Sequence, residues 1–340
     1  MMDTINSGNN PGEIYEILTG YWKTGILKAA IELDVFTEIA QENDTIRKMA
    51  TVLQVKERGL IVLLDALCGM KLLDKKGDTY VLGLTAEKFL VSSEPSYVGQ
   101  SVKCLVPPES WESYGQITKA IKKGAPLRED PPTVDYWERV ADGLIPMGIP
   151  IAQAMCDLIN INDAVRPKLR ILDLACGSGI YGYTILQRNS RATVTDLDLE
   201  HVLEYAKGIA NKLGVTDRVT YQVGDILTSD YGEDLFEIAI ISNILQGFDP
   251  DTVKTILAKV YRALSLGGTI VINEFVPDDE RAVETFPLLF AVFMFLETQG
   301  GGTYTFSEFS NWLSELGFAD VTLHNLSEPN SLIIGHKPNL

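Results

Sequence analysis

The sequence predicts an α/β protein, in which a mainly helical, winged-helix-like N-terminal domain precedes a doubly wound, seven-stranded sheet that ends in an antiparallel hairpin. Strand-like and helix-like segments alternate from about residue 168 onward, and such βα repeats form mostly parallel sheets. The first hundred residues instead follow the order helix, helix, helix, hairpin. Two final strand-like segments flank a Glu-Pro-Asn-Ser turn and predict the terminal hairpin. A length of 340 residues fits two domains.

The N-terminal domain is expected to span residues 1–100. Its first segment carries apolar residues at intervals of three and four, as an amphipathic helix does. Asp44 or Thr45 is placed to cap the next, shorter helix. The pattern predicts helices over residues 14–33, 45–53 and 57–70, and two short strands around 75–78. Helix, helix, helix, hairpin is the order of a winged helix.

A winged helix raises the question of DNA binding, and the charge argues against it. Residues 1–100 contain 10 Lys and Arg against 14 Asp and Glu, and the whole chain has a formal net charge of −17. Binding to phosphates needs clustered Lys and Arg. The helix in the recognition position, residues 57–70, is rich in Leu, Ile, Val and Ala. We therefore expect packing or dimerisation rather than a nucleic-acid partner.

Residues 101–165 are expected to connect the two domains and to contribute to a substrate pocket. Proline-rich segments at 107–110 and 129–132 indicate breaks. Helices are predicted over residues 113–122 and 134–160. Trp137 and Met147 lie in the second of these, and their spacing suits a pocket wall and a core equally well.

The C-terminal domain, residues 166–340, carries the alternating pattern. An apolar run at 287–296 is too short for a membrane span and predicts a buried helix. A helix is expected to end at Gly267 and Gly268. Strands are predicted over residues 169–175, 192–198, 218–226, 236–245, 269–275, 321–326 and 331–337, and helices over 199–214, 251–268 and 306–318.

Cysteine and histidine usage does not indicate a metal centre. Cys68, Cys104, Cys156 and Cys176 include no CxxC pair, and only three histidines are present. A zinc site is therefore not expected. The polar N-terminus lacks the features of a signal peptide. We expect a cytoplasmic protein with reduced cysteines and no membrane partner.

A glycine-rich turn follows the first predicted strand of the sheet. Gly177, Gly179 and Gly182 formally satisfy the dinucleotide pattern GxGxxG. Asp173 stands just before the turn, where a pyrophosphate would be repelled. A cationic sulfonium ligand with an ammonium group gains from that carboxylate, and the helix N-terminus suits the ligand's own carboxylate. The glycines let the backbone approach the ligand closely.

Two further acids end the second and third strands of the predicted sheet. Asp198 is placed to accept both ribose hydroxyls of a nucleoside. Asp225 is placed to accept from an adenine amino group, with Ile226 packed on the ring. Single acids of this kind often cap the next helix. Three acids at successive strand ends favour a cofactor.

These segments resemble the class I S-adenosylmethionine-dependent methyltransferases. More closely, the chain resembles the small-molecule O-methyltransferases of the hydroxyindole and plant type, which carry a winged-helix dimerisation domain. The matching segments are 173–179, where Ala175 and Cys176 replace two glycines, 198–206, 224–227 and 263–275. The resemblance implies a Rossmann-like fold, S-adenosylmethionine as cofactor, a homodimer and a role in secondary metabolism. It also implies that Ala175 and Ser242 belong to the cofactor site.

The chain departs from the family at the catalytic position. The family uses a His-Asp pair after the fourth strand, and here Gln246 and Gly247 stand in those places. Glutamine cannot take a proton at neutral pH. Glu274 aligns with a family glutamate that orients the base. A second family glutamate falls at Thr303, and the neighbouring Tyr304 is a candidate for the substrate pocket.

Several reactions fit this pattern. Methyl transfer from a sulfonium needs mainly alignment of donor and acceptor, so Gln246 and Glu274 suit O-methylation with Glu274 or a water as base. They also suit C-methylation or transfer to an acceptor that is already ionised. Another reading is an enzyme of this fold that binds the cofactor but catalyses cyclisation or decarboxylation. A winged-helix ligand-binding regulator is the remaining alternative. The acceptor is expected to be a small aromatic or polyketide-like metabolite.

Overall fold

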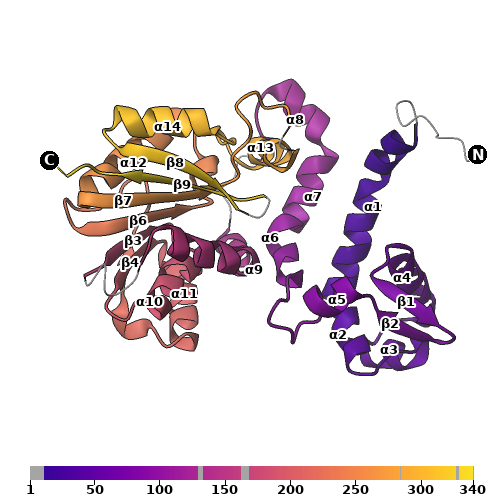
Figure 1. The fold of residues 1–340 in the computed structure, drawn as a ribbon. Coiled ribbons are helices and arrows are strands. Elements are labelled where there is room, and N and C mark those ends of the chain that lie inside the picture. Colours follow the sequence, from indigo (N-terminus) through magenta and orange to yellow (C-terminus); the bar gives the residue numbers. More distant parts are fainter. Residues whose placement is uncertain (1–10, 129–132, 162–167, 284, 327–328, 340) are drawn as a thin grey trace, which may run out of the picture. The chain divides into compact units, whose positions relative to one another are not determined.

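The computed structural model describes residues 11–128, 133–161, 168–283, 285–326 and 329–339. The chain forms two compact units, Met1–Val102 and Lys103–Leu340 (Figure 1). The segment 101–165, expected to be a connector, therefore packs almost entirely with the second unit.

The first unit has helices followed by a hairpin, as expected, but four helices precede the hairpin rather than three, because Asp34, with a φ of +56°, separates α2 from α1. Thr45 caps the third helix by accepting from the Lys48 amide at 3.4 Å, which decides between the two predicted caps. Phe36, Leu64 and Tyr80 are among the side chains that fill the core. The elements are α1 (Gly12–Glu32), α2 (Val35–Ala40), α3 (Ile46–Val52), α4 (Glu57–Gly69), β1 (Leu73–Lys76), β2 (Thr79–Leu82) and α5 (Leu84–Phe89).

Helix α1 carries a row of large apolar side chains that its own unit leaves exposed. They lie on its N-terminal half, and each is more than half exposed. Isolated exposed apolar residues are ordinary, but a contiguous group of this size marks an interaction surface. The residues are Ile14, Tyr15, Ile17, Leu18, Tyr21 and Trp22.

The second unit begins with helices that differ in part from the prediction. Residues 107–110 do not form a break, because Pro108 occupies the first turn of a helix, where its missing N–H costs nothing. The predicted helix 113–122 is two helices, separated at the non-helical Gln116. The predicted break at 129–132 lies outside the described residues. The elements are η1 (Gly99–Ser101), α6 (Val102–Leu105), α7 (Pro108–Gly115), α8 (Ile117–Lys123) and α9 (Val134–Leu158).

The seven-stranded sheet has the order β5-β4-β3-β6-β7-β9-β8. Pairing is parallel from β5 through β7 and antiparallel at β9 and β8, which confirms the predicted class of fold. The strands are β3 (Arg170–Leu174), β4 (Thr193–Asp198), β5 (Val219–Val223), β6 (Phe236–Ser242), β7 (Leu264–Glu274), β8 (Ala319–Asn325) and β9 (Ser331–His336).

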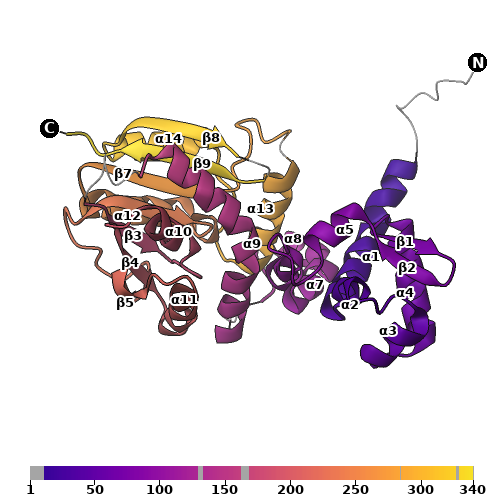
Figure 2. The same cartoon turned by 60° about the horizontal axis from the view of Figure 1, so that its bottom comes forward.

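Helices cover both faces of the sheet (Figures 1 and 2). Helices α9, α10 and α11 share one apolar core with one face. Helices α12 and α14 share a second core with the other face. The remaining elements of the unit are α10 (Ile180–Arg188), α11 (Glu200–Lys212), η2 (Thr216–Arg218), η3 (Leu245–Gly247), α12 (Pro250–Ala263), α13 (Thr285–Glu297) and α14 (Phe306–Glu315).

Two boundaries of the predicted sheet elements are wrong. The helix predicted over 251–268 ends at Ala263, and Gly267 and Gly268 lie inside the bulged strand β7. Gly267 has a φ of +73° and its N–H donates to the Lys337 carbonyl, so it shapes the bulge rather than a helix end. The strand predicted over 236–245 stops at Ser242, because Asn243 turns the chain with a φ of +51°.

Helix α13 confirms the helix expected at 287–296, but it is not fully buried. Pro287, Met294 and Leu296 are buried, whereas Leu289 is 62% exposed. None of the described helices is both long and apolar enough to cross a membrane.

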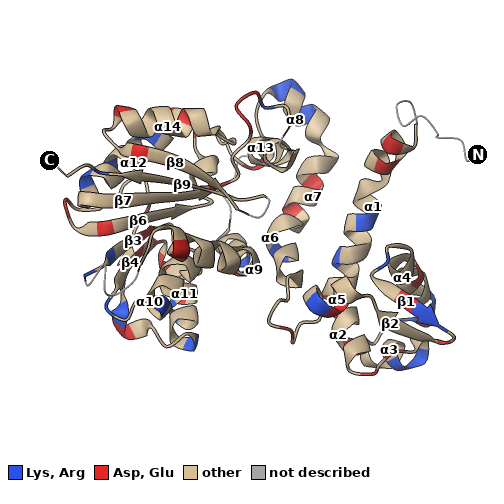
Figure 3. Cartoon of the chain, in the orientation of Figure 1, with Lys and Arg blue, Asp and Glu red and all other residues tan. Residues whose placement is uncertain are grey.

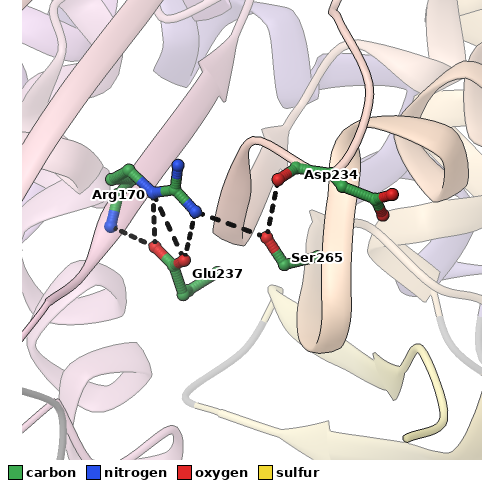
Figure 4. A network of polar contacts seen from close by, with 4 residues as sticks. All are labelled: Arg170, Asp234, Glu237 and Ser265. Atoms are coloured by element: carbon green, nitrogen blue, oxygen red, sulfur yellow. Dashed lines mark hydrogen bonds and ion pairs between the residues drawn. The ribbon is translucent and has the colours of Figure 1, made fainter. Parts of the chain in front are cut away.

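The amino ends of β3 and β6 are held by a polar network (Figure 4). The Arg170 guanidinium donates to the Glu237 carboxylate at 2.6 Å, and the Arg170 amide donates to the same group at 2.7 Å. Ser265 receives a contact from Arg170 and donates to the Asp234 carbonyl. This network lies at the strand ends opposite the glycine-rich turn, so it belongs to the scaffold.

Candidate active site

The turn after β3 brings three left-handed residues together before α10. Ala175, Gly177 and Gly179 have φ values of +51°, +56° and +72°. The N–H groups of these residues donate within the chain, to the Leu197 carbonyl, the Asp198 carboxylate and the Cys176 carbonyl. A Cβ on Gly179 would overlap the Tyr183 ring, so glycine is required there. A Cβ on Gly177 would make ordinary contact with Ala141, at 3.7 Å, so the glycine leaves a space the size of a side-chain carbon beside the turn.

Asp173 connects the strand before this turn to the helix after it. The side chain is 1% exposed, and one carboxylate oxygen accepts from the Gly182 amide at 3.1 Å. Asp173 pairs with Asp196 across β3 and β4. Burial, and then the charge of Asp196, raise the pKa of Asp173 well above its usual value. Asp173 therefore holds the glycine-rich turn against α10.

Asp198 joins the end of β4 to the same turn. Its carboxylate accepts from the Gly177 amide at 2.9 Å and from the Leu199 amide at 2.7 Å. Burial raises the pKa of Asp198. The sequence-predicted residues Asp198 and Gly177 are thus in direct contact.

Asp225 and Ile226 follow β5, the neighbouring strand. Asp225 is exposed and accepts from the Leu227 amide at 2.7 Å. Ile226 is 8% exposed, and its carbonyl accepts from Tyr231 and from Lys259. An exposed carboxylate beside a fixed apolar side chain can bind the edge and the face of an aromatic base.

Ser242, at the end of β6, belongs to a network that the sequence did not reveal. The Asn273 amide donates to the Ser242 hydroxyl at 2.8 Å and to the Tyr181 hydroxyl at 3.1 Å. Burial raises the pKa of Tyr181 to about 12, so its hydroxyl stays protonated. Only the position of Asn273, one residue before Glu274 at a strand end, could have suggested it.

Gln246 lies in a short turn beyond β6 and is 7% exposed. Its side-chain N–H donates to the Asn243 backbone carbonyl at 3.3 Å, and its backbone carbonyl accepts from the Gly302 amide at 2.9 Å. Its Oε1 is buried and has no hydrogen-bond partner among the described residues. The amide is therefore oriented, with one acceptor atom left free.

Glu274 ends β7 beside this turn and is 3% exposed. Its Oε1 accepts from the Ile244 amide at 3.0 Å and from the Leu245 amide at 2.9 Å. Burial raises the pKa of Glu274 to about 8, against the opposing effect of those amides. A pKa near the working pH is what a general base or acid needs.

Four buried polar atoms around this turn lack partners among the described residues. Such atoms are rare in folded proteins and call for an explanation. Each can accept a hydrogen bond, so together they favour a bound molecule that carries a donor. They are Asn243 Oδ1, Gln246 Oε1, Glu274 Oε2 and Thr303 Oγ1.

The three residues suggested for the substrate pocket have different surroundings. Trp137 is half-buried on α9 and packs edge-on against Tyr136, with ring centroids 5.2 Å apart. Met147, on the same helix, is also half-buried. Tyr304 is 7% exposed, its hydroxyl donates to the Phe248 carbonyl, and its ring contacts Phe309 and Trp312. Tyr304 is thus engaged in the core.

Charge on the described surface is mixed. Figure 3 shows Lys and Arg scattered among Asp and Glu on each unit. In the residues that the structure describes, no group of three His, Cys, Asp or Glu is arranged to hold a metal ion. The four cysteines are free.

An acid-lined glycine turn at the carboxyl edge of a parallel sheet, with an antiparallel hairpin at β9 and β8, defines a class I S-adenosylmethionine-dependent methyltransferase. Comparison with known families is more specific. Residues 153–319 match an O-methyltransferase domain and residues 15–92 match an O-methyltransferase dimerisation domain. The chain belongs to this O-methyltransferase family.

Individual relatives cover the whole chain. The tetracenomycin polyketide synthesis 8-O-methyl transferase of Streptomyces glaucescens is 26% identical over 337 residues, covering 96% of this chain and 97% of the relative. A crystal structure of a putative O-methyltransferase from Nostoc punctiforme has a TM-score of 0.89 at 29% identity, covering 97% of this chain and all of the other. Human N-acetylserotonin methyltransferase, solved with S-adenosylmethionine, shares the fold with a TM-score of 0.84 at 18% identity, covering 98% of this chain and all of the other.

The cofactor of this protein is S-adenosylmethionine, and the residues present fit it. The absence of a Cβ at Gly177 leaves a space beside Ala141 through which a ligand can approach the backbone. Asp225 offers an exposed carboxylate next to the buried Ile226. The excess of carboxylates at this edge complements a ligand that carries a sulfonium and an ammonium group.

Proposed function

We propose that Glu274 is the general base of this methyltransferase and that Gln246 positions the acceptor. The carrying observation is the arrangement of Glu274: one carboxylate oxygen is anchored by two backbone amides, while Oε2 is buried without a partner. A pKa of about 8 lets that group hold or release a proton near neutral pH.

The cofactor is the source of the methyl group, and side chains of the protein orient the acceptor and take its proton. When bound, S-adenosylmethionine would supply an already activated methyl group, whose bond to sulfur breaks as its bond to the acceptor oxygen forms, with S-adenosylhomocysteine as the leaving group. Glu274 Oε2 takes the proton that the acceptor oxygen loses as its new bond to carbon forms. Gln246 Oε1 accepts a hydrogen bond from the acceptor and orients it, since an amide cannot take the proton.

We assign the cofactor contacts by position. The turn at Ala175, Gly177 and Gly179 is proposed to lie against the ligand because its glycines let the backbone approach closely, while its N–H groups are already engaged within the chain. Asp198 suits the ribose and Asp225 the adenine amino group, with Ile226 against the ring. The Ser242 hydroxyl lies at the end of β6, next to the turn that carries Gln246.

The acceptor is proposed to be an aromatic or polyketide-like metabolite. The Streptomyces relative is named for such a substrate. Aromatic side chains also continue from Glu274 along α13. Phe275 lies 5.0 Å from Phe286 and 4.6 Å from Phe290, measured between ring centroids, and Phe290 lies 5.3 Å from Phe293. Trp137 and Met147, both on α9, are proposed to line the wall of the acceptor pocket, whereas Tyr304 packs in the core.

The protein is proposed to act as a homodimer in the cytoplasm. The dimerisation-domain match covers α1, and the exposed apolar face of that helix is a suitable contact surface. Free cysteines are usual in a reducing compartment.

Incubation with isotopically labelled S-adenosylmethionine and a panel of aromatic acceptors tests the proposal. We expect a product that gains one methyl on oxygen, and we expect Glu274→Gln to abolish it without changing affinity for S-adenosylhomocysteine. A methyl found on carbon would favour C-methylation instead. A product of altered mass without the label would show a reaction other than methyl transfer and would overturn the proposal.

A further inference from the structure

A cavity lies in the same unit, between α7, the segment 127–128 that follows α8, and α13. It has a volume of about 400 Å³. Helices α7 and α13 are in contact, and Figure 1 shows α8 beside them. The lining residues are Glu109, Glu112, Ser113, Gln116, Leu127, Arg128 and Leu296.

This cavity presents charges of both signs, with Arg128 close enough to attract the carboxylates of Glu109 and Glu297. Among the described residues, neither Arg128 nor Glu112 has an ion-pair partner within 4.0 Å. Glu109 is paired with Arg139 at 2.7 Å through one oxygen, and its other oxygen is buried without a partner. Unpaired charges of both signs on one wall complement a ligand that carries both an ammonium and a carboxylate group.

The two carboxylates at the cavity, Glu109 and Glu112, outnumber the unpaired cation, Arg128, and Glu297 adds a third carboxylate nearby. Its carboxyl lies near the hydroxyls of Ser110 and Ser113, and its Oε1 is buried without a partner. Ser110 is 4% exposed, and its hydroxyl also lacks a partner among the described residues. Glu297 Oε1 is therefore left to accept a hydrogen bond, such as one from an ammonium group.

The cavity is within reach of the proposed reaction site. Helix α13 ends at Glu297, and Gly302, five residues later, donates to the carbonyl of Gln246. Five residues span at most about 18 Å. Helix α13 thus joins the two places: its first half contacts Phe275, next to Glu274, and its last turn carries Leu296, which lines the cavity.

From this geometry we infer that the acceptor carries a zwitterionic, amino-acid-like head. Arg128 binds its carboxylate as a two-pronged hydrogen-bond donor, and Glu112 binds its ammonium group, with Glu109 and Glu297 adding negative potential. The inference rests on the proposed function, because it assigns the cavity to the acceptor of the same reaction.

Calorimetry with the full chain saturated with S-adenosylhomocysteine tests this inference. The probes are L-tyrosine, tyramine, which lacks the carboxylate, and 3-(4-hydroxyphenyl)propionate, which lacks the ammonium group. We expect L-tyrosine to bind at least about tenfold more tightly than either of the others, since a charge-assisted contact of about 1.5–3 kcal/mol is lost with each group.

Two variants separate the two charges. Arg128→Met is expected to weaken L-tyrosine and the propionate but leave tyramine unchanged. Glu112→Gln is expected to weaken L-tyrosine and tyramine but leave the propionate unchanged. Arg170→Met and Glu237→Gln are matched controls from the opposite end of the sheet (Figure 4) and are expected to change none of the three affinities.

Four results would overturn the inference. Equal affinities for the three probes would show that the site does not recognise a zwitterionic head. An equal loss of affinity for all three in Arg128→Met would show that Arg128 only supports the structure. Binding of S-adenosylhomocysteine without binding of any probe would reject the inference alone. Absence of S-adenosylhomocysteine binding would reject the proposed function and, with it, this inference.

Discussion

At the scale of single residues, Gln246 stands where the family has a histidine base, and in our proposal Glu274 takes over the role of that base. A family glutamate that orients a base is here left with a free, buried oxygen. The sequence placed Asp198 and Gly177 correctly at one site, because strand-end position is readable from the pattern. It could not reveal the Tyr181–Asn273–Ser242 network. Side chains from three segments meet there, and only packing brings them together.

Substituting Gln246 tests its proposed positioning role. Gln246→Ala should lower kcat less than tenfold, since it removes one orienting hydrogen bond of about 0.5–1.5 kcal/mol. Gln246→His should restore an imidazole base and move the rising limb of the kcat–pH profile toward pH 6.5. Gln222→His, on β5, is the control and should leave the profile unchanged. A rate at background level in Gln246→Ala would give Gln246 a larger role than positioning.

The pKa of Glu274 also predicts how stability depends on pH. Its pKa is about 8 in the folded protein and near 4.5 when the chain is unfolded. Between these values the folded state holds a proton that the unfolded state has lost, so this group lowers stability as pH rises from about 4.5 to 8. Glu274→Gln should therefore gain more in Tm, relative to wild type, at pH 8 than at pH 5. Thermal melts across that range measure it, and an equal difference at both pH values would contradict the raised pKa.

At the scale of elements, the local sequence predicted helices and strands better than their ends. Pro108 begins α7 rather than breaking the chain. Gly267 and Gly268 lie inside β7 because pairing with β6 and β9 carries that strand back to Leu264. In both places a tertiary contact decides between two structures that proline or glycine allows.

The glycine-rich turn yields a prediction at this scale. Gly179→Ala places a Cβ against the Tyr183 ring at a φ of +72°, and should cost about 1–3 kcal/mol for the backbone alone. It should also weaken binding of S-adenosylhomocysteine. Gly208→Ala is the matched control, because Gly208 lies in α11 with nothing within 4 Å, and it should be neutral or slightly stabilising. Denaturant unfolding and calorimetry compare the two, and equal stabilities would contradict the need for glycine at position 179.

At the scale of the whole molecule, the sequence predicted two parts, and the mainly parallel pairing of the sheet followed from alternating βα units. It could not show where the chain divides. The segment 103–161 belongs with the sheet unit, because α9 packs on α10 and α11. The cavity beside α7 and α13 could not be predicted from the sequence either, because its charged residues look like ordinary surface residues there.

The exposed face of α1 carries a prediction about assembly. Ile17→Asp should shift the protein from dimer to monomer, because it places a charge in the centre of an apolar contact. Leu84→Asp is the control, since Leu84 is 86% exposed on α5 and away from the α1 face. Sedimentation velocity reports the mass of each variant. A dimer that survives Ile17→Asp unchanged would place the contact elsewhere.

The central claim is that Glu274 takes the proton of the acceptor during methyl transfer. Its most direct test is the pH dependence of kcat for the wild type and Glu274→Gln, with S-adenosylmethionine and the acceptor found by labelling. The wild-type kcat should rise with pH, with its midpoint near pH 8 and a plateau above it, while the variant should be at least about a hundredfold slower and independent of pH. A Glu274→Gln enzyme with the wild-type rate and the wild-type profile would contradict the claim.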